Sequence, residues 1–342
     1  MTAELPRPMV RYRDDIAHEM RAVLGERDLA IYSMMRYHLG WPENGRNAPE
    51  VIGKFFRASL CLAACTAMGG DYHAALPVAA GIELLHNFSL IHDDIEDESH
   101  SRRNRDSVWR VWGEAQAINA GDGMFALARL AVHRAADRGV SADNVLKVMA
   151  RIDQASLELA EGQFEDLAFE ERADVSLTEY MAMAARKTGA VMGAAAAAGA
   201  LAADAPDEAV QSFEAFGRKL GVAFQVKDDA LGLWGDSTRT GKGIEEDIRS
   251  RKKSFPVVYG LAQPDGAAPG LLRSLIAQDT IDDTDGREIV SLLEGLGAHR
   301  AADIEAAALV KGALDELKPL HLAGAALEDL GALAAFVQER EA

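Results

Sequence analysis

The segment 74–98 constrains the fold most strongly, because it is apolar around almost its whole circumference until it ends in carboxylates. A helix that is hydrophobic on all sides has to be surrounded by other elements. The acidic run Asp93-Asp94-Ile95-Glu96-Asp97 closes this segment. The sequence therefore predicts a buried central helix that carries an acidic group at its inner end.

Strand signals are almost absent from the rest of the chain, because β-branched runs are short and apolar residues rarely alternate with polar ones. We expect loops at 99–107 and 235–243, and no internal repeat or long linker divides the chain. Helices are expected at 10–38, 54–69, 113–138, 142–170, 207–233 and 253–261, at 176–203 behind the capping box Ser176-Leu177-Thr178-Glu179, and over 267–340. The prediction is an all-α fold and a single domain over 1–342.

Composition excludes several classes of function. The net charge of −18 argues against binding to nucleic acid or to an anionic membrane surface. Cys61 and Cys65 are expected to be small buried hydrophobes, and so few cysteines suit a reducing cytoplasm. The start of the chain has no apolar signal region, and the Ala/Gly-rich run 190–203 is too short to span a membrane.

A second acidic pair, Asp228-Asp229, ends another apolar segment. Crowded carboxylates repel one another unless cations lie between them, and Mg²⁺ accepts oxygen ligands that it shares with phosphates. Asp93 and Asp97 are one helical turn apart and reach the same ion, with Asp94 beside them. One acidic turn is common on a solvated helix, but two pairs that both end apolar helices indicate a metal site.

Basic residues accompany both acidic pairs. Alone, each would be an ordinary surface charge, but together they supply what two diphosphate groups require. They are Lys54, Arg57, Arg102, Arg103, Arg186, Lys187, Lys242 and Lys253.

These motifs, in this order over residues 50–260, resemble those of the trans-isoprenyl diphosphate synthases, which elongate prenyl chains head to tail. The matching runs are Gly53-Lys54-x-x-Arg57, 83–103, Lys187-Thr188-Gly189 and 224–229. The resemblance implies a helical bundle around a deep central cavity, usually in a homodimer. It also implies a prenyltransferase that condenses isopentenyl diphosphate with dimethylallyl, geranyl or farnesyl diphosphate.

The resemblance also assigns roles. Asp93, Asp97 and Asp228 look like direct ligands of about three Mg²⁺ ions, for which Mn²⁺ could substitute, with Asp94 and Asp229 in support. Further residues would bind the substrates. Arg102, Lys187 and Lys253 would hold the allylic diphosphate, and Lys54, Arg57, His86 and Arg103 would hold isopentenyl diphosphate. Thr188 and Gln225 would stabilise the carbocation, and Gln163 and Asp166 would line the cavity wall. Lys242 would belong to a loop that closes over the site.

Two histidines on the central helix are interpreted differently. His86 matches an anion-binding position, whereas we expect His92 to be a packed, hydrogen-bonded core residue.

Product length is expected to depend on Phe88, the fifth residue before Asp93, with Ser89 beside it. At about 1.5 Å per residue, Phe88 would lie roughly 7 Å below the metal site. Phe88 is either ordinary core or a floor that stops elongation. In the family, this arrangement looks like a geranylgeranyl (C20) synthase; farnesyl (C15) and geranylfarnesyl (C25) or longer products stay open.

The chain departs from the family pattern at Ile52, Ala58 and Asp106, none of which removes a ligand. The second motif has Gly232 in place of its last carboxylate, so metal affinity could fall while activity survives. A class I terpene cyclase and a non-catalytic regulatory subunit are the alternatives. The basic residues for isopentenyl diphosphate argue against the first, and the intact aspartates against the second.

Overall fold

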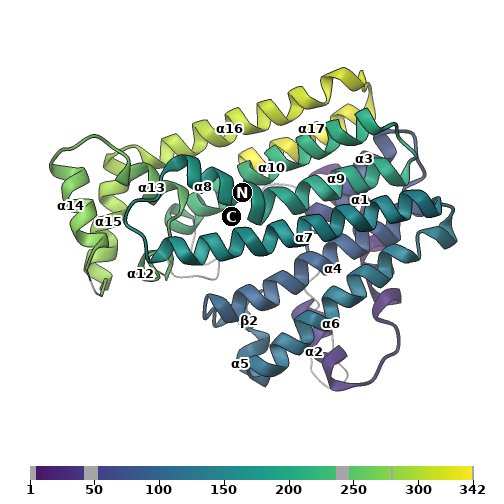
Figure 1. Cartoon of the computed structure of the whole chain (residues 1–342), viewed down its shortest axis with the longest axis horizontal. Coiled ribbons are helices and arrows are strands. Elements are labelled where there is room, and N and C mark those ends of the chain that lie inside the picture. The colour runs from purple at the N-terminus through teal and green to yellow at the C-terminus, as the bar shows by residue number, and fades with distance from the viewer. Residues whose placement is uncertain (1–4, 42–52, 236–245, 279, 341–342) are drawn as a thin grey trace.

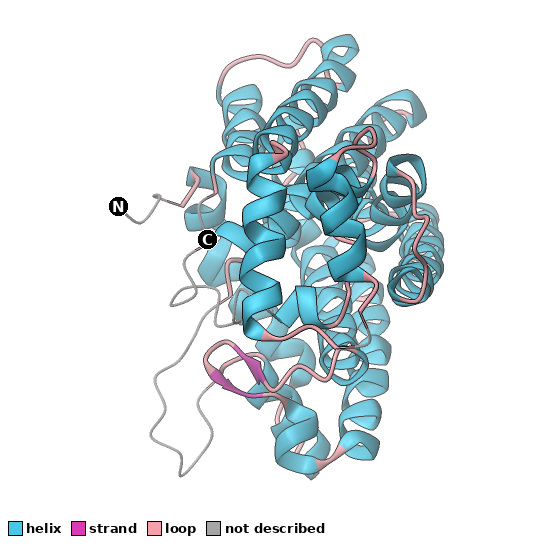
Figure 2. Cartoon of the chain, turned by 90° about the vertical axis from the view of Figure 1, so that its left-hand side faces the viewer, coloured by secondary structure: helices cyan, strands magenta, loops and turns pink. Residues whose placement is uncertain are grey.

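The computed structural model describes residues 5–41, 53–235, 246–278 and 280–340. Within these ranges the chain is almost entirely helical, and the predicted all-α fold is confirmed (Figures 1 and 2). The helices are α1 Arg7–Leu24, α2 Ala30–His38, α3 Phe56–Ala67, α4 Tyr72–Glu96, α5 Val108–Trp112, α6 Glu114–His133, η1 Ala136–Arg138, α7 Ala142–Glu170, α8 Leu177–Ala184, η2 Ala185–Gly189, α9 Ala190–Ala202, α10 Asp207–Trp234, α12 Glu246–Arg249, α13 Phe255–Leu261, α14 Ala267–Ile276, α15 Asp283–Gly295, α16 Ala298–Glu316, η3 Lys318–Leu320 and α17 Ala325–Glu339.

Helix α4 is the predicted central helix. The side chain of Asp71 accepts a hydrogen bond from the backbone N–H of His73 and caps its start. Its apolar residues are buried against α1, α3, α6 and α9. Because it has no polar face, α4 is also long and apolar enough to cross a membrane, but 78% of that apolar window is buried inside the bundle.

Helix α9 packs between α3 and α10, and these three helices lie above α4 in Figure 1. Their backbones approach so closely that a Cβ atom at Gly217 of α10 would lie 2.3 Å from the carbonyl oxygen of Met192 on α9. The alanine-rich run that forms α9 is almost wholly buried. Small residues therefore allow α9 and α10 to approach each other closely.

Several predicted boundaries were wrong. The single helix expected over 10–38 is two helices, because the chain turns at Gly25, which has a φ of 60° that L side chains rarely adopt. The helix expected over 113–138 is α6, preceded by the short α5 and followed by η1. The loop at 99–107 contains a small antiparallel hairpin of β1 (Ser101–Arg102) and β2 (Arg105–Asp106).

Other local predictions are confirmed. Ser176 and Glu179 form the capping box that opens α8. Cys61 and Cys65 are free and buried. In addition, Pro256 of the helix expected over 253–261 lies in the first turn of α13, where its missing N–H costs no helical hydrogen bond.

Candidate functional site

The acidic ends of α4 and α10 open into one cavity of about 300 Å³ between α3, α4, α7, η2, α9 and α10. Sequence-predicted residues make up most of its lining. The cavity is lined by Arg57, His86, Ser89, Leu90, Asp93, Asp97, Arg102, Leu159, Gln163, Lys187, Thr188, Val191, Phe224, Gln225, Asp228 and Lys252.

Asp93 and Asp97 are one turn apart at the end of α4, and both reach the cavity. Burial raises the pKa of Asp93 to about 6, and the neighbouring Asp97 adds to the shift, while Lys187 opposes it. Burial thus makes the ionised form of the Asp93 carboxylate energetically unfavourable. A cation in the cavity would relieve that cost.

The second residue of the first pair faces inward. Asp94 is buried and accepts hydrogen bonds from Nε of Arg102 at 3.0 Å and from Nη2 of Arg102 at 2.5 Å. Arg102 itself lines the cavity. Asp94 therefore holds the Arg102 guanidinium in position and does not itself face the cavity.

Asp229, the second residue of the other pair, also turns away from the cavity. Its Oδ2 accepts hydrogen bonds from the Tyr180 hydroxyl at 2.6 Å and from the Phe255 N–H at 2.8 Å, and its Oδ1 accepts one from Gln225 at 2.8 Å. Burial raises the pKa of Asp229 to about 6, although these hydrogen bonds favour its ionised form. Asp229 fastens α8 and α13 to α10.

Asp228 faces the cavity and has an unexpected partner. Nη2 of Arg340, one residue past the end of α17, lies 2.9 Å from its Oδ1. The Arg340 guanidinium also lies 4.0 Å from the centroid of the Phe224 ring. Nothing in the sequence near Arg340 points to this contact, because it depends on where α17 ends in space.

The π-helical turn η2 delivers Lys187 and Thr188 to the cavity. Isolated π turns within longer helices are frequent at functional sites. The turn fits against α7 at Gly162, where a Cβ atom would lie 2.3 Å from the backbone nitrogen of Lys187. The Thr188 hydroxyl donates to Oε1 of Gln225 at 2.6 Å, which fixes the two polar groups predicted to face the reacting carbon.

Gln163 lines the cavity as predicted, whereas Asp166 is buried behind the lining and forms ion pairs with two lysines of the wall. Nζ of Lys187 lies 2.6 Å from its carboxylate, and Nζ of Lys252 lies 3.5 Å away. Burial alone would raise the pKa of Asp166, but Lys252 and Lys187 hold it below its ordinary value. The structure thus places two lysines beside the carboxylates of both motifs.

Lys253, predicted to bind the allylic diphosphate, does not line the cavity. It is buried, and its Nζ donates to the backbone carbonyl oxygens of Glu170 and Arg251 at 3.1 and 3.0 Å. Its neighbour Lys252 occupies the position expected of it. In a run of two lysines, the sequence does not reveal which side chain faces inward.

The predicted isopentenyl diphosphate residues divide into two sets. Arg57 and His86 line the cavity, and Nη1 of Arg57 lies 3.1 Å from Nε2 of His86. Burial and the nearby Arg57 hold the pKa of His86 well below its usual value, so the imidazole is neutral and accepts from Arg57. His86 therefore orients the positively charged Arg57 guanidinium and carries no charge itself.

Arg103 and Lys54 lie outside the cavity lining. Arg103 is held behind it by the backbone carbonyl of His38 and by Oδ1 of Asn87, the latter at 2.9 Å. The Lys54 ammonium lies 5.9 Å from the centroid of the Phe336 ring, and burial, followed by Arg340, lowers its pKa. Lys242 lies outside the described residues.

Phe88 also lies outside the cavity lining, whereas Ser89 belongs to it. The Phe88 ring packs edge-on against Phe125 of α6, with centroids 5.1 Å apart, and against His92 at 5.6 Å. Nε2 of His92 lies 3.3 Å from the carbonyl oxygen of Ile118, a packed arrangement like the one expected. These rings therefore lie on the side of α4 that packs against α6, outside the cavity lining.

The donor set fits a hard divalent cation only in part. Asp93, Asp97 and Asp228 supply carboxylate oxygens from two sides of the cavity. Among the described residues, however, no three acidic, His or Cys side chains are close enough to hold an ion by themselves. An ion here would need further oxygens, which phosphate groups supply.

Comparison with known proteins gives one consistent result. A family model described as polyprenyl synthetase matches residues 44–293. The chain is 38% identical to a (2E,6E)-farnesyl diphosphate synthase of Mycobacterium tuberculosis, over 96% of this chain and 92% of that protein. It is 37% identical to a geranylgeranyl diphosphate synthase of the same organism, over 91% and 87%. The crystal structure of a polyprenyl synthetase from Streptomyces coelicolor A3(2) superposes with a TM-score of 0.89 at 33% identity, over 98% of this chain and 99% of that one.

Proposed function

The chain belongs to the polyprenyl synthetase family, and from this premise we propose how its cavity works as that of a short-chain prenyl diphosphate synthase. Enzymes of this family are prenyltransferases that use isopentenyl and allylic diphosphates and generally depend on divalent metals. One observation carries the proposal. Asp93 and Asp97 line the same cavity as Asp228, and Lys187, Lys252 and Arg102 line it beside them.

Three carboxylates would hold Mg²⁺: Asp93 and Asp97 from α4 and Asp228 from α10. When bound, Mg²⁺ supplies the charge that stabilises the departing diphosphate. Lys187, Lys252 and Arg102 would bind the same diphosphate as point charges and as a planar donor. Asp94 and Asp166 hold these cations in place before the substrate arrives, which lowers the cost of organising them during the reaction.

Isopentenyl diphosphate would bind opposite, between Arg57 and the C-terminal end of α17. Arg57 is oriented by His86, and Lys54 and Arg340 add charge near the Asp228 side. Leaving of the allylic diphosphate breaks a C–O bond, and the isopentenyl double bond then forms the new C–C bond. The departing diphosphate takes the released proton, so no carboxylate base is needed.

Thr188 and Gln225 would face the cationic carbon, because their hydrogen bond leaves oxygen lone pairs at the wall of the cavity. Leu90, Leu159, Val191 and Phe224 complete an apolar wall. Such a wall excludes water, which would otherwise quench the cation.

We propose geranylgeranyl diphosphate as the main product. Phe88 and Phe125 form an aromatic layer beyond the Ser89 wall, where they would stop a growing chain. Farnesyl diphosphate is the second candidate. The cavity of about 300 Å³ does not reach Phe88, and a farnesyl and a geranylgeranyl diphosphate synthase are about equally similar to this chain.

The enzyme is further proposed to be a cytoplasmic homodimer that pairs through α6 and α7. Both helices expose large apolar side chains, which cost free energy in water unless a partner covers them. They are Ile118 and Leu130 on α6 and Leu146, Leu157 and Phe164 on α7, with 46–73% of their surface exposed.

The test is incubation of the purified protein with labelled isopentenyl diphosphate, Mg²⁺ and each allylic diphosphate in turn, followed by product sizing. We expect elongation with at least one primer and a main product of twenty carbons. A fifteen-carbon end product would replace the proposed length. Hydrocarbons released without isopentenyl diphosphate would indicate a cyclase, and no reaction with any primer would contradict the proposal.

A further inference from the structure

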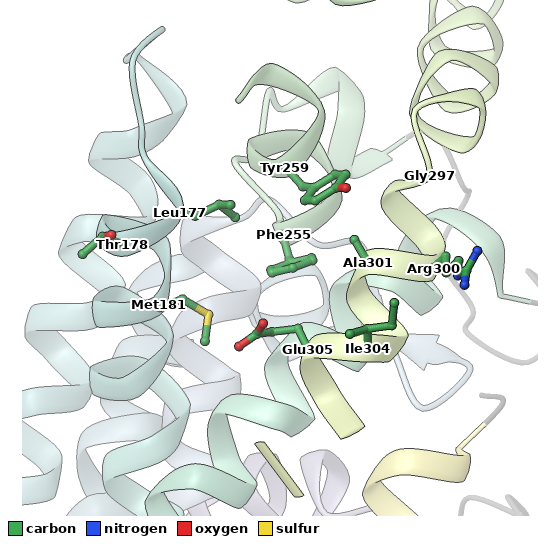
Figure 3. A pocket seen from close by; sticks show the side chains of 10 residues that line it. All are labelled: Leu177, Thr178, Met181, Phe255, Tyr259, Gly297, Arg300, Ala301, Ile304 and Glu305. Atoms are coloured by element: carbon green, nitrogen blue, oxygen red, sulfur yellow. The ribbon is translucent and has the colours of Figure 1, made fainter. Parts of the chain in front are cut away.

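A second cavity, larger than the catalytic one, lies between α8, α13 and α16 (Figure 3). Its volume is about 720 Å³, within the range of about 300–1,000 Å³ that is typical of small-molecule sites. Three separate elements supply its walls. They contribute Leu177, Thr178 and Met181 from α8, Phe255 and Tyr259 from α13, and Gly297, Arg300, Ala301, Ile304 and Glu305 from the start of α16.

The walls are mostly apolar and partly aromatic. The rings of Phe255 and Tyr259 stack with their centroids 6.3 Å apart. Ile304 is 60% exposed although it lines the cavity. An apolar side chain left in water beside a cavity of this size favours an occupant with apolar surface.

One acidic group projects among these apolar side chains. The Glu305 carboxylate points towards Met181, whereas the Arg300 guanidinium points away from the other lining residues (Figure 3). No hydrogen bond or ion pair joins Glu305 to another side chain in the described part of the chain. A half-buried carboxylate without a partner favours an occupant that carries a positive charge. Aromatic faces such as that of Phe255 also attract organic cations.

The inner wall of this cavity is connected to the catalytic site. The Phe255 N–H and the Tyr180 hydroxyl both donate to Oδ2 of Asp229. Asp229 is adjacent in sequence to Asp228, which faces the catalytic cavity. The rings of Tyr180 and Phe255 also touch, with centroids 5.7 Å apart. Helix α8 continues into η2, which carries Lys187. An occupant that displaces Phe255 or α8 therefore moves groups that position the catalytic residues.

We propose that this cavity binds a small organic cation, with an apolar body against Phe255, Met181 and Ile304 and a protonated amine on Glu305. Its occupancy is coupled to the second aspartate pair through Phe255 and Tyr180. Coupling of this kind is reciprocal, so substrate in the catalytic cavity changes the affinity for the amine by the same factor. The coupling rests on the proposed function, but the binding itself does not.

Dansylcadaverine is a suitable probe, because it joins an apolar fluorophore to a primary amine. Its N-acetyl derivative has no charge and serves as the matched neutral ligand. Fluorescence titration of the full-length protein is expected to show about tenfold tighter binding of the amine. Glu305→Gln should abolish this preference without weakening the neutral ligand, whereas Glu294→Gln, the same change on the exposed face of α15, should leave it intact.

A filled cavity gives an independent test. Ala301→Trp should weaken both ligands at least tenfold, with thermal unfolding used to confirm that the variant folds. The binding proposal is overturned if neither ligand binds the wild type, or if the amine keeps its advantage in Glu305→Gln. For the coupling, saturating amine should change the KM for the allylic diphosphate several-fold in the wild type and leave Glu305→Gln unchanged. An unaltered KM in the wild type, with binding intact, overturns the coupling alone.

Discussion

The two aspartate pairs look alike in sequence but differ in what their inward residues hold. In both, adjacent positions on a helix point in different directions, so one carboxylate faces the cavity and the other is buried. Asp94 holds Arg102, a cation of the cavity wall. Asp229 holds Tyr180 and the backbone of Phe255 instead, and so joins two other helices to α10.

The cavity-facing residues differ as well. On α4, Asp93 has a second carboxylate, Asp97, one turn away. On α10 the corresponding later position is Gly232, and Asp228 is paired with Arg340. The first pair therefore provides more negative charge for cations, and the second is tied more firmly into the architecture. Similar motifs thus divide metal binding and structural support between them.

The largest expected effect is loss of turnover when a cavity-facing carboxylate is neutralised. Asp93→Asn and Asp228→Asn should each lower kcat at least about 100-fold, because each removes an oxygen ligand whose charge binds the cation. Asp94→Asn should cost less, since it acts through Arg102. Steady-state kinetics of the three variants, with the exposed Asp137→Asn as control, provide the measurement. Equal losses for Asp94 and Asp93 would contradict the division into facing and buried residues.

Adjacent lysines allow a sharper test beside the second pair. Lys252→Ala should raise the KM for the allylic diphosphate about tenfold or more, and it should cost little stability because Asp166 keeps its closer ion pair with Lys187. Lys253→Ala should instead lower the free energy of unfolding by about 1–3 kcal/mol, because the carbonyl groups of Glu170 and Arg251 lose the donor that the buried ammonium supplies. Urea unfolding and kinetics of both variants separate the roles. If Lys253→Ala instead raised the KM and Lys252→Ala lowered the stability, Lys253 would be the lysine that binds the substrate.

The pH dependence of stability should report both pairs in the metal-free protein. The pKa values of Asp93 and Asp229 are raised from 3.8 to about 6 in the folded state. Between pH 4 and 6 the folded protein then binds more protons than the unfolded chain, so stability falls as pH rises through this window. Urea unfolding at pH 4.5 and 6.5 should show a smaller difference for Asp93→Asn than for the wild type. An unchanged difference would mean that Asp93 has an ordinary pKa.

The smallest effect on rate is expected at the aromatic layer below the first pair. Phe88→Ala should lengthen the main product by at least one five-carbon unit, because it removes the ring that packs on Phe125 of α6 and is proposed to stop the growing chain. Phe125→Ala should act in the same direction. Total turnover should change only a few-fold, since no catalytic group is lost. Product sizing decides the point, and an unchanged distribution in both variants would place the floor elsewhere.

The sequence was sufficient to predict the all-α class, the central helix and the capping box at Ser176. These features depend on local chemistry: hydrophobic periodicity, capping residues and the absence of strand patterns are written directly into neighbouring residues. The two acidic motifs were also found this way, because each lies at the end of an apolar helix. Many other cavity-lining residues, including His86, Gln163, Thr188 and Gln225, were named from the resemblance to the trans-isoprenyl diphosphate synthases.

The resemblance already singled out Asp93 and Asp228 within the aspartate pairs, but only the tertiary structure showed that Lys252, and not Lys253, lines the cavity. The side-chain directions of Asp93 and Asp94, or of Lys252 and Lys253, depend on how helices and turns rotate against their neighbours. The Arg340 contact arises because α17 ends beside Asp228, more than a hundred residues away along the chain. Local patterns determined the composition of the site, and long-range packing determined its orientation, since packing is a property of contacts between distant segments.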